Sequence, residues 1–318
     1  MSEETIPKIA VITGPTATGK TALGVQLALE LGGEIVSADS MQIYRGMDIG
    51  TAKATAEEMR GIPHHMLDVA DPRESWSVSL YVQAADLCVR DILSRGRVPI
   101  VVGGTGLYID SLINGRDFAG GEPDEALRNE LNEKFDRVGG QAMLEQLRLA
   151  DPQRAEKLHP ADKKRIVRAL EVYISTGRTI TDHDIESQSL PPRYDAAVIA
   201  LSFRDRDMLY RRIDTRVDDM AERGLFDEVE ALLRSGVPEN ATSMQAIGYK
   251  EAVRALKGEI TRAEALELIK RESRRYAKRQ LTWLRRKEQI KWILWEGSPD
   301  FDFARRCSTE YFAAHGLK

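Results

Sequence analysis

Short apolar runs alternate with longer stretches of helical periodicity over the first third of the chain. The runs at residues 9–12, 34–37 and 98–102 have the length and composition of buried strands. Residues 21–29 and 79–93, which lie between them, place apolar side chains on one helical stripe. Strands that alternate with helices predict an α/β fold with a doubly wound parallel sheet, whose ligands bind beyond the carboxyl ends of the strands.

Two breaks rich in glycine, proline and serine interrupt this pattern, at residues 114–123 and 187–193. Between them the periodicity is helical throughout. Helices are expected at 125–138, at 141–150, in a short piece ending at Pro160, and at 163–175 before Gly177. The simplest organisation is a core domain of residues 1–115 and 194–318, with a helical domain of residues 116–193 inserted into it.

The pattern after the second break returns to a strand and then becomes helical. Residues 196–201 form another buried apolar run. Long helices are expected near 205–222, 225–235, 243–257 and 261–287, followed by a short strand at 292–295. The strand would extend the core sheet, and the helices would complete the core domain.

The composition describes a globular protein, with 30% charged and 42% apolar residues among 318. No apolar stretch approaches the roughly 20 residues that span a bilayer, and the acidic N-terminus does not resemble a signal peptide. The two cysteines, Cys88 and Cys307, are far apart and lack metal-binding spacing. We therefore expect reduced thiols and a cytoplasmic location, without a membrane partner.

The net charge of −4 hides a strongly basic segment near the C-terminus. Residues 270–291 hold ten basic and two acidic side chains, a local charge of +8, so the rest of the chain carries −12. Tyr276, Gln280, Trp283 and Arg286 are interleaved with the basic residues at helical spacing. Rings and planar groups beside positive charge favour contact with nucleic acid, although a solvated helix face remains the alternative.

A phosphate-binding loop joins the first strand to the first helix. It consists of Gly14, Pro15, Thr16, Ala17, Thr18, Gly19, Lys20 and Thr21. Glycines let successive N–H groups surround an anion, the helix N-terminus and Lys20 add positive charge, and the Thr21 hydroxyl is placed to hold Mg²⁺. The loop predicts that a diphosphate or a triphosphate is bound, without deciding between them.

Polar residues also follow the next two strands of the predicted sheet. Asp39 comes directly after residues 34–37, and Thr105 follows residues 98–102. Because the carboxyl ends of parallel strands lie at one edge of a sheet, both should face the same cleft as the phosphate loop.

The sequence resembles the bacterial tRNA dimethylallyltransferases, from the phosphate loop almost to Trp295. The resemblance rests on the loop and on motifs at residues 39–44, 50–53, 103–108, 164–171, 245–250 and 278–285. It implies a P-loop kinase-like core and transfer of a dimethylallyl group from dimethylallyl diphosphate to N6 of the adenine 3′ of the anticodon, with release of pyrophosphate. It also suggests a monomer.

The resemblance assigns catalytic roles to three residues. Asp39 matches the general base that accepts a proton from N6, and Thr105 matches a position that contacts the target base. Arg216 matches an arginine that reaches the diphosphate, together with the phosphate loop and Mg²⁺ on Thr21. Such a base cannot react while it is stacked, so it would be flipped into the pocket.

The resemblance also implies a set of tRNA contacts. Asp39, Ser40, Met41, Gln42 and Thr105 would meet the flipped base. Further contacts would come from Arg128, Lys164, Arg165 and Arg168 in the inserted domain, and from Gln245, Gly248, Tyr249, Lys250, Lys278, Arg279, Gln280, Trp283 and Arg285 in the core. The family usually has glutamine at position 164, so a base contact there would become a phosphate contact.

Two other readings of the phosphate loop stay open. A small-molecule or nucleotide kinase would use residues 120–190 as a lid and Asp39 to hold the acceptor hydroxyl, but it would not need the basic segment. An RNA-binding ATPase or adaptor without prenyl transfer would not need Asp39 and Arg216. We expect no metal at Asp218-Asp219, a solvated helix face, or at the adjacent His64 and His65, whose side chains point apart.

Overall fold

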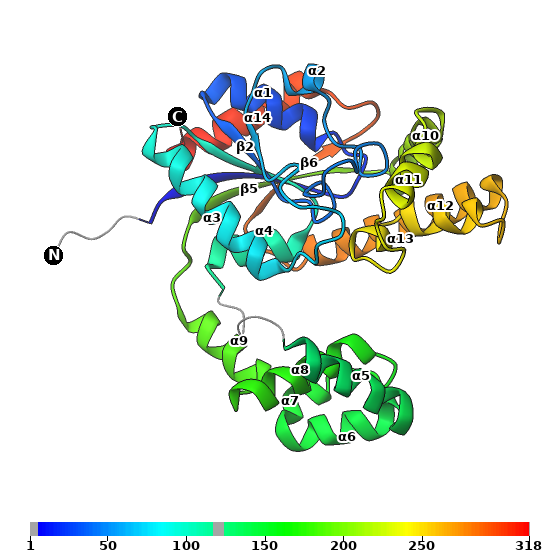
Figure 1. Ribbon diagram of the computed structural model, residues 1–318. Helices are drawn as coiled ribbons and strands as arrows, with labels where there is room; N and C mark the ends of the chain where they lie inside the picture. Colours follow the sequence, from blue (N-terminus) through cyan, green and yellow to red (C-terminus); the bar gives the residue numbers. More distant parts are fainter. Residues whose placement is uncertain (1–5, 117–123, 318) are drawn as a thin grey trace. The chain divides into compact units, whose positions relative to one another are not determined.

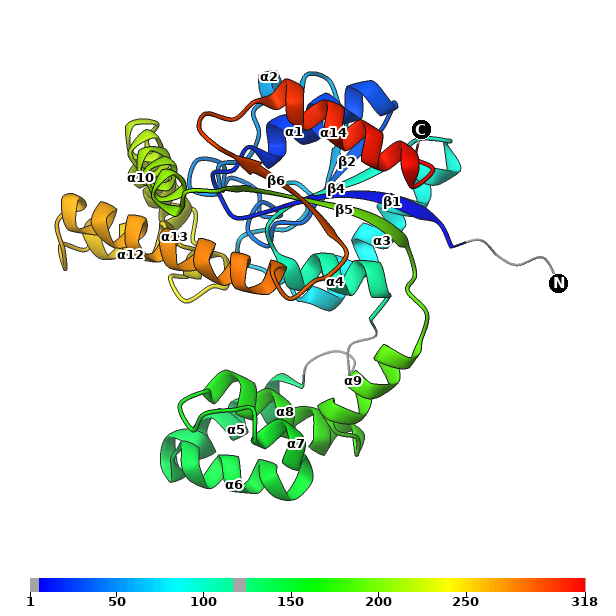
Figure 2. The same ribbon diagram turned by 180° about the vertical axis from the view of Figure 1, so that it is seen from behind.

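The computed structural model describes residues 6–116 and 124–317. The chain divides into two compact units, a larger one of residues 1–113 and 193–318 and a smaller one of residues 114–192. Part of the first predicted break, residues 117–123, lies outside the described residues. The two units are described separately below (Figures 1 and 2).

The larger unit contains a six-stranded sheet in which every strand pair is parallel. The strand order is β3-β2-β4-β1-β5-β6. The strands are β1 (Lys8–Thr13), β2 (Glu34–Ser37), β3 (His64–His65), β4 (Pro99–Val102), β5 (Asp195–Phe203) and β6 (Ile290–Trp295). The prediction of a doubly wound parallel α/β fold is confirmed.

Helices cover both faces of this sheet (Figures 1 and 2). One face carries α1 (Lys20–Leu31) and α14 (Phe301–Ala314), and the other carries α3 (Val78–Ser94) and α4 (Gly106–Asn114). The sheet, α1 and α14 share a core that includes Ile12, Leu27, Ile199 and Phe312, all without solvent exposure. Because β1 and β4 in the middle of the sheet are buried almost throughout, they appear as apolar runs in the sequence.

A second core of the larger unit is built mainly by helices. They are α10 (Arg206–Glu222), α11 (Leu225–Arg234), α12 (Tyr249–Leu256) and α13 (Arg262–Leu284), with a 3₁₀ turn at Ser243–Gln245. The short α2 (Ala56–Met59) has no buried residue and is not part of this core. Ile43, Met47, Val229 and Tyr249 are fully buried there. The helix predicted at 243–257 is divided into the 3₁₀ turn and α12, because Gly248 has φ +103°.

The C-terminal end differs most from the sequence pattern. Strand β6 begins two residues before the predicted strand at 292–295, and α14 was not predicted. Asp300 caps α14 by accepting the N–H of Phe303, and Arg305 binds Glu30 of α1 at 2.7 Å. Phe303 is exposed whereas Phe312 is buried, so the large apolar residues of α14 do not lie on one face. The sequence pattern therefore does not identify this helix.

The smaller unit is helical. Its elements are α5 (Glu125–Val138), α6 (Gly140–Ala150), α7 (Pro152–Ala155), α8 (Lys163–Thr176) and α9 (Ile180–Ser189). Leu131, Leu147, Ile166 and Leu170 form its core. Helix α9 was not predicted, and it begins at a capping box of Thr179 and Asp182. Among the described residues of the whole chain, no helix has the length and apolarity needed to cross a bilayer.

Candidate active site

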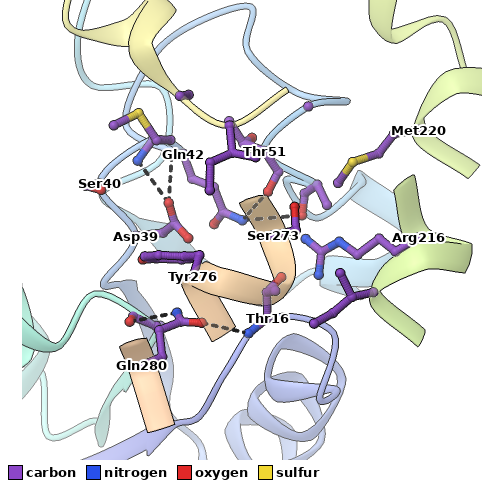
Figure 3. A pocket seen from close by; sticks show the side chains of 18 of the residues that line it. Thr16, Asp39, Ser40, Gln42, Thr51, Arg216, Met220, Ser273, Tyr276 and Gln280 are labelled. Carbon is purple, nitrogen blue, oxygen red and sulfur yellow. Dashed lines mark hydrogen bonds between the residues drawn. The ribbon is translucent and has the colours of Figure 1, made fainter. Parts of the chain in front are cut away.

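A cavity of about 380 Å³ lies in the larger unit, where β1, β2 and β4 end. Polar residues from the phosphate loop, the end of β2, α10 and α13 line one part of it. Apolar side chains line another part, namely Ile213, Val217, Met220, Ile247 and Ile269. Figure 3 shows Arg216 and Asp39 approaching the cavity from opposite sides. The cavity is therefore able to hold a molecule with an anionic end and an apolar end.

The phosphate loop has the backbone conformation that anion binding needs. Gly14, Ala17 and Gly19 have φ values of +141°, +65° and +88°. A side chain at Gly14 would place its Cβ only 2.3 Å from the carbonyl oxygen of Leu201, so this position admits no larger residue. Gly19 precedes α1 without a side-chain cap, which leaves the first N–H groups of the helix for a ligand.

Side chains from the protein hold the loop carbonyl groups. The Pro15 oxygen accepts hydrogen bonds from Thr18 Oγ1 (2.8 Å) and Lys20 Nζ (2.7 Å). Outside the loop, Arg212 Nε donates to the Ala17 oxygen at 3.2 Å, and Trp295 Nε1 donates to the Thr18 oxygen at 3.1 Å. With its carbonyl oxygens turned toward the protein, the loop can present N–H groups to an anion.

Two cationic side chains of the site lie in surroundings that disfavour their charge. Burial and, to a smaller extent, the charge of Arg216 lower the pKa of Lys20 to about 7, although Asp39 acts in the opposite direction. Burial also lowers the pKa of Arg216 from its usual value, and Asp39 opposes this shift. A polyanion between the two would relieve both effects, so the site is suited to a diphosphate.

We expect pyrophosphate binding to take up a proton above pH 7. Free Lys20 has a pKa of about 7 rather than its usual 10.5, and a bound anion raises that pKa. The ammonium group must therefore be re-formed on binding, and affinity should fall as the pH rises from about 7 toward 10. Calorimetry at pH 8 in buffers of different ionisation enthalpy measures this uptake, and an enthalpy independent of the buffer would contradict it.

Asp39 lies directly after β2 and forms a turn. Its Oδ1 accepts the N–H groups of Met41 (2.9 Å) and Gln42 (3.4 Å). Thr105 Oγ1 accepts the N–H of Ser40 at 3.2 Å, so the ends of β2 and β4 are joined beside Asp39. Both turn hydrogen bonds go to Oδ1, so Oδ2 can accept a proton while the turn stays intact.

Tyr276 lies beside Asp39, as Figure 3 shows. Burial raises the pKa of Tyr276 to about 12, and the charge of Asp39 contributes in the same direction. Arg279 lies over the Tyr276 ring, 5.5 Å from its centroid. The ring therefore stays neutral and offers a flat surface near the carboxylate, which is the kind of group on which a base stacks.

The segment after Asp39 lines the cavity as predicted for Ser40, Met41 and Gln42. The Gln42 amide is already occupied, however. Its Nε2 donates to the carbonyl oxygens of Thr51 (3.2 Å) and Ala52 (3.3 Å), and its Oε1 accepts from Ser37 Oγ at 3.3 Å. In this structure Gln42 holds the neighbouring segment, so a base contact would require these bonds to change.

Gln280 links the phosphate loop to the turn after β4. Its Oε1 accepts the N–H of Thr16 at 3.0 Å, and its Nε2 donates to the Gly104 oxygen at 2.9 Å. The side chain is buried, with 8% exposure. Trp283, one helical turn on, packs against Gly106, where an added Cβ would lie 2.4 Å from the indole. Gln280 therefore has a structural role, and because it also lines the cavity, its predicted tRNA contact stays a prediction.

Replacing Gln280 with leucine should destabilise the fold by about 1–3 kcal/mol, because the Thr16 N–H and the Gly104 oxygen would lose their partner while buried. Chemical denaturation measures the free energy of unfolding. Lys278→Ala is the matched control, since Lys278 lies two residues earlier on the exposed face of α13. Equal unfolding free energies for the two variants would contradict the bridging role.

The basic segment is only partly available to RNA. Lys270 binds Asp218 at 2.8 Å, and Lys287 binds Asp110 at 2.7 Å. The exposed cations include Lys278, Arg279 and Arg285, which were predicted to contact tRNA. Asp218, the first residue of the Asp218-Asp219 pair, thus forms an ion pair with a lysine of α13.

The motif at residues 245–250 divides between the cavity and the core. Gln245 and Lys250 are exposed and line the cavity. Tyr249 has no exposed surface, and its hydroxyl donates to Glu228 Oε1 at 2.6 Å. Gly248 is buried and starts α12, with its N–H bound to Glu251. The prediction that the Tyr249 side chain contacts tRNA is therefore wrong for this fold, because that side chain is a core group.

The smaller unit holds four predicted tRNA contacts on α5 and α8. Arg128 forms two hydrogen bonds of 3.0 Å with the carboxylate of Glu171, and Arg168 binds the same carboxylate at 2.9 Å. Glu171 is 1% exposed, so it holds both guanidinium groups in place. Lys164 and Arg165 are exposed near the start of α8. Their positive charge is therefore accessible to a phosphate backbone.

The adjacent histidines His64 and His65 bind different partners. His65 Nε2 lies 2.7 Å from Glu34 Oε2, whereas His64 Nδ1 lies 2.8 Å from the Ile62 oxygen. Cys88 and Cys307 are free and partly buried. Sequence reasoning missed Arg212 and Trp295 as supports of the phosphate loop, and only the apolar run at 292–295 hinted at the latter.

Comparisons with known proteins agree with this geometry. A family model described as IPP transferase matches residues 42–287, and one described as isopentenyl transferase matches residues 7–72. A tRNA dimethylallyltransferase of a Thermoanaerobacter species is 46% identical over 307 residues, covering 96% of this chain and 98% of the relative. One from Desulforudis audaxviator is 48% identical over 287 residues, covering 90% and 92%.

Solved structures show the same relationship. The tRNA isopentenylpyrophosphate transferase of Bacillus halodurans matches with a TM-score of 0.71 and 43% identity, covering 98% of this chain and 96% of that one. A eukaryotic dimethylallyltransferase acting on tRNA matches with a TM-score of 0.82 and 29% identity, covering 97% and 80%. The chain therefore belongs to the IPP transferase family.

Proposed function

We propose that the protein transfers the dimethylallyl group of dimethylallyl diphosphate to N6 of the adenine 3′ of the anticodon in tRNA. The observation that carries this proposal is the arrangement of the cavity. Lys20 and Arg216 offer positive charge to a diphosphate, and Asp39 lies across the same cavity. The names of the relatives support the choice of substrates.

The diphosphate is held by the loop amides, Lys20 and Arg216. The guanidinium fork of Arg216 suits paired phosphate oxygens, and Lys20 acts as a point charge. The Thr21 side chain lines the cavity and would supply one oxygen ligand to Mg²⁺. Mg²⁺ commonly takes one or two protein oxygens and completes its shell with phosphate oxygens and water, so this donor fits the metal. When bound, Mg²⁺ would neutralise charge on the leaving pyrophosphate.

In the proposed reaction, the allylic carbon–oxygen bond breaks, pyrophosphate leaves, and adenine N6 bonds to the carbon. The exocyclic amine loses a proton, which Asp39 accepts through the carboxylate oxygen not used by the turn. Ile213, Val217 and Met220 surround the dimethylallyl group, and Tyr276 lies near the flipped base.

The tRNA is held by exposed positive charge. The exposed cations among the predicted contacts are Lys250 of α12, Lys278, Arg279 and Arg285 of α13, and Lys164 and Arg165 of α8. These contacts to phosphates make binding dependent on salt. We further propose that the protein acts as a monomer in the cytoplasm.

Release of pyrophosphate from dimethylallyl diphosphate tests the proposal. It should occur when unmodified tRNA is present and stop when tRNA is omitted. A kinase with this loop would instead transfer phosphate from ATP to a small hydroxyl acceptor, and an RNA-dependent ATPase would release inorganic phosphate from ATP. Either product, without prenylated tRNA, would overturn the proposal.

A further inference from the structure

Most of the motif Gly50-Thr51-Ala52-Lys53 forms a wall of the cavity. Gly50, Thr51 and Ala52 all line the cavity. Ala52 has a left-handed φ of +46°, which a residue other than glycine adopts only when its surroundings hold it. The segment is irregular, so its shape depends on the side chains that bind it.

Glu228 of α11 binds this segment from one side. Its Oε2 accepts the N–H groups of Asp48 (2.8 Å) and Ile49 (2.7 Å), and its Oε1 accepts that of Gly50 (3.1 Å). Oε1 also accepts the Tyr249 hydroxyl at 2.6 Å. One carboxylate thus receives three successive backbone N–H groups, an arrangement that hydrogen-bonds strongly because the acceptor is charged.

Gln42 binds the same segment from the other side, through the carbonyl oxygens of Thr51 and Ala52. The N–H of Gln42 in turn donates to Asp39 Oδ1. A continuous series of hydrogen bonds therefore runs from Glu228 through residues 48–52 and Gln42 to Asp39. Gly50 also packs closely against the Tyr249 ring, because a Cβ added at this position would lie only 2.4 Å from the ring. This close packing further restricts the segment.

We propose that Glu228 is a positioning residue for prenyl transfer, because it fixes the cavity wall at residues 48–52 and through it the amide of Gln42 beside Asp39. The inference rests on the proposed function, because prenyl transfer is the reaction that Glu228 would serve. The hydrogen bonds by which Glu228 holds residues 48–50 are a property of the free protein. A neutral glutamine cannot replace the carboxylate, since it has one acceptor oxygen and would turn its NH₂ group toward a donor.

The variant Glu228→Gln tests the inference, with Glu230→Gln as its matched control. Glu230 lies two residues further along α11, where its 43% exposed carboxylate binds Arg234 at 2.6 Å. Hydrogen exchange on the free proteins should show the amides of residues 48–50 opening about tenfold faster in Glu228→Gln than in the control. Tyr249→Phe removes one hydrogen bond and keeps the charge, so it should show a smaller increase.

Steady-state kinetics then separate positioning from general destabilisation. In Glu228→Gln, kcat should fall about tenfold or more, whereas pyrophosphate affinity should stay within about twofold, because among the described residues Glu228 hydrogen-bonds to residues 48–50 and Tyr249 and not to the phosphate loop. Equal exchange in the two glutamine variants would overturn the inference, and so would a parallel loss of kcat, pyrophosphate affinity and melting temperature. Absence of prenyl transfer by the wild-type protein would instead overturn the proposed function, while the exchange result would still decide whether Glu228 holds the wall.

Discussion

Replacing Asp39 with asparagine should lower the rate of prenyl transfer by about 10²–10⁴, the usual contribution of a positioned proton acceptor. The loss should appear in kcat, with little change in the binding of either substrate, since the interaction strengthens mainly in the transition state. An exocyclic adenine amine is a weak nucleophile whose lone pair is delocalised into the ring. It therefore depends on a carboxylate that orients N6 and takes its proton.

The asparagine substitution is informative because it preserves the turn. Its side-chain oxygen can still accept the N–H groups of Met41 and Gln42, as Asp39 Oδ1 does, and asparagine is among the best residues for such a turn. Single-turnover assays with saturating tRNA measure the chemical step. Asp302→Asn, an exposed site on α14, is the control. Prenylation by Asp39→Asn near the wild-type rate would falsify the role of general base, though not the family assignment.

Much of the fold could be predicted because the sheet is parallel and helices cover both of its faces. Strands β1 and β4 and most of β5 are buried and therefore appear as apolar runs, whereas buried β2 has only Ile35 and Val36 between two polar residues. Their parallel order also places the phosphate loop and Asp39 at one edge, so both could be assigned to one cavity from the sequence. Thr105 is not among the lining residues, but it joins that edge through its hydrogen bond with the Ser40 N–H. Strand β3 has only two residues and lacks such a pattern.

The parts that escaped prediction depend on partners distant in the sequence. Gln280 lies in a basic helix and resembles an RNA contact, but its amide bonds belong to Thr16 and Gly104, 264 and 176 residues away. Tyr249 is likewise adjacent to an exposed lysine, while its own hydroxyl binds Glu228 in the core. Helical periodicity gives the face on which a residue lies, but not what the rest of the chain places against that face.

Replacing Lys20 with alanine should nearly abolish prenyl transfer, with a rate at least about 10³-fold lower, while leaving tRNA binding largely intact. Removing one preorganised donor from a site of developing charge commonly costs about 10²–10³, and Lys20 also carries a full charge to the leaving diphosphate. Arg216 remains in the variant, but it is held by α10 and cannot supply an ammonium group at the start of α1.

The tRNA affinity should survive because Lys278 and Arg285 of α13 and Lys164 and Arg165 of α8 are exposed cations that do not line the cavity. Filter binding with unmodified tRNA measures it, and calorimetry with pyrophosphate measures the other site. Lys278→Ala should give the reverse result, with weaker tRNA binding and unchanged pyrophosphate binding, because its exposed ammonium group is proposed to bind phosphates of the RNA backbone. A collapse of tRNA affinity in Lys20→Ala would show that the diphosphate and RNA sites cannot be separated, and that RNA binding needs an intact phosphate loop.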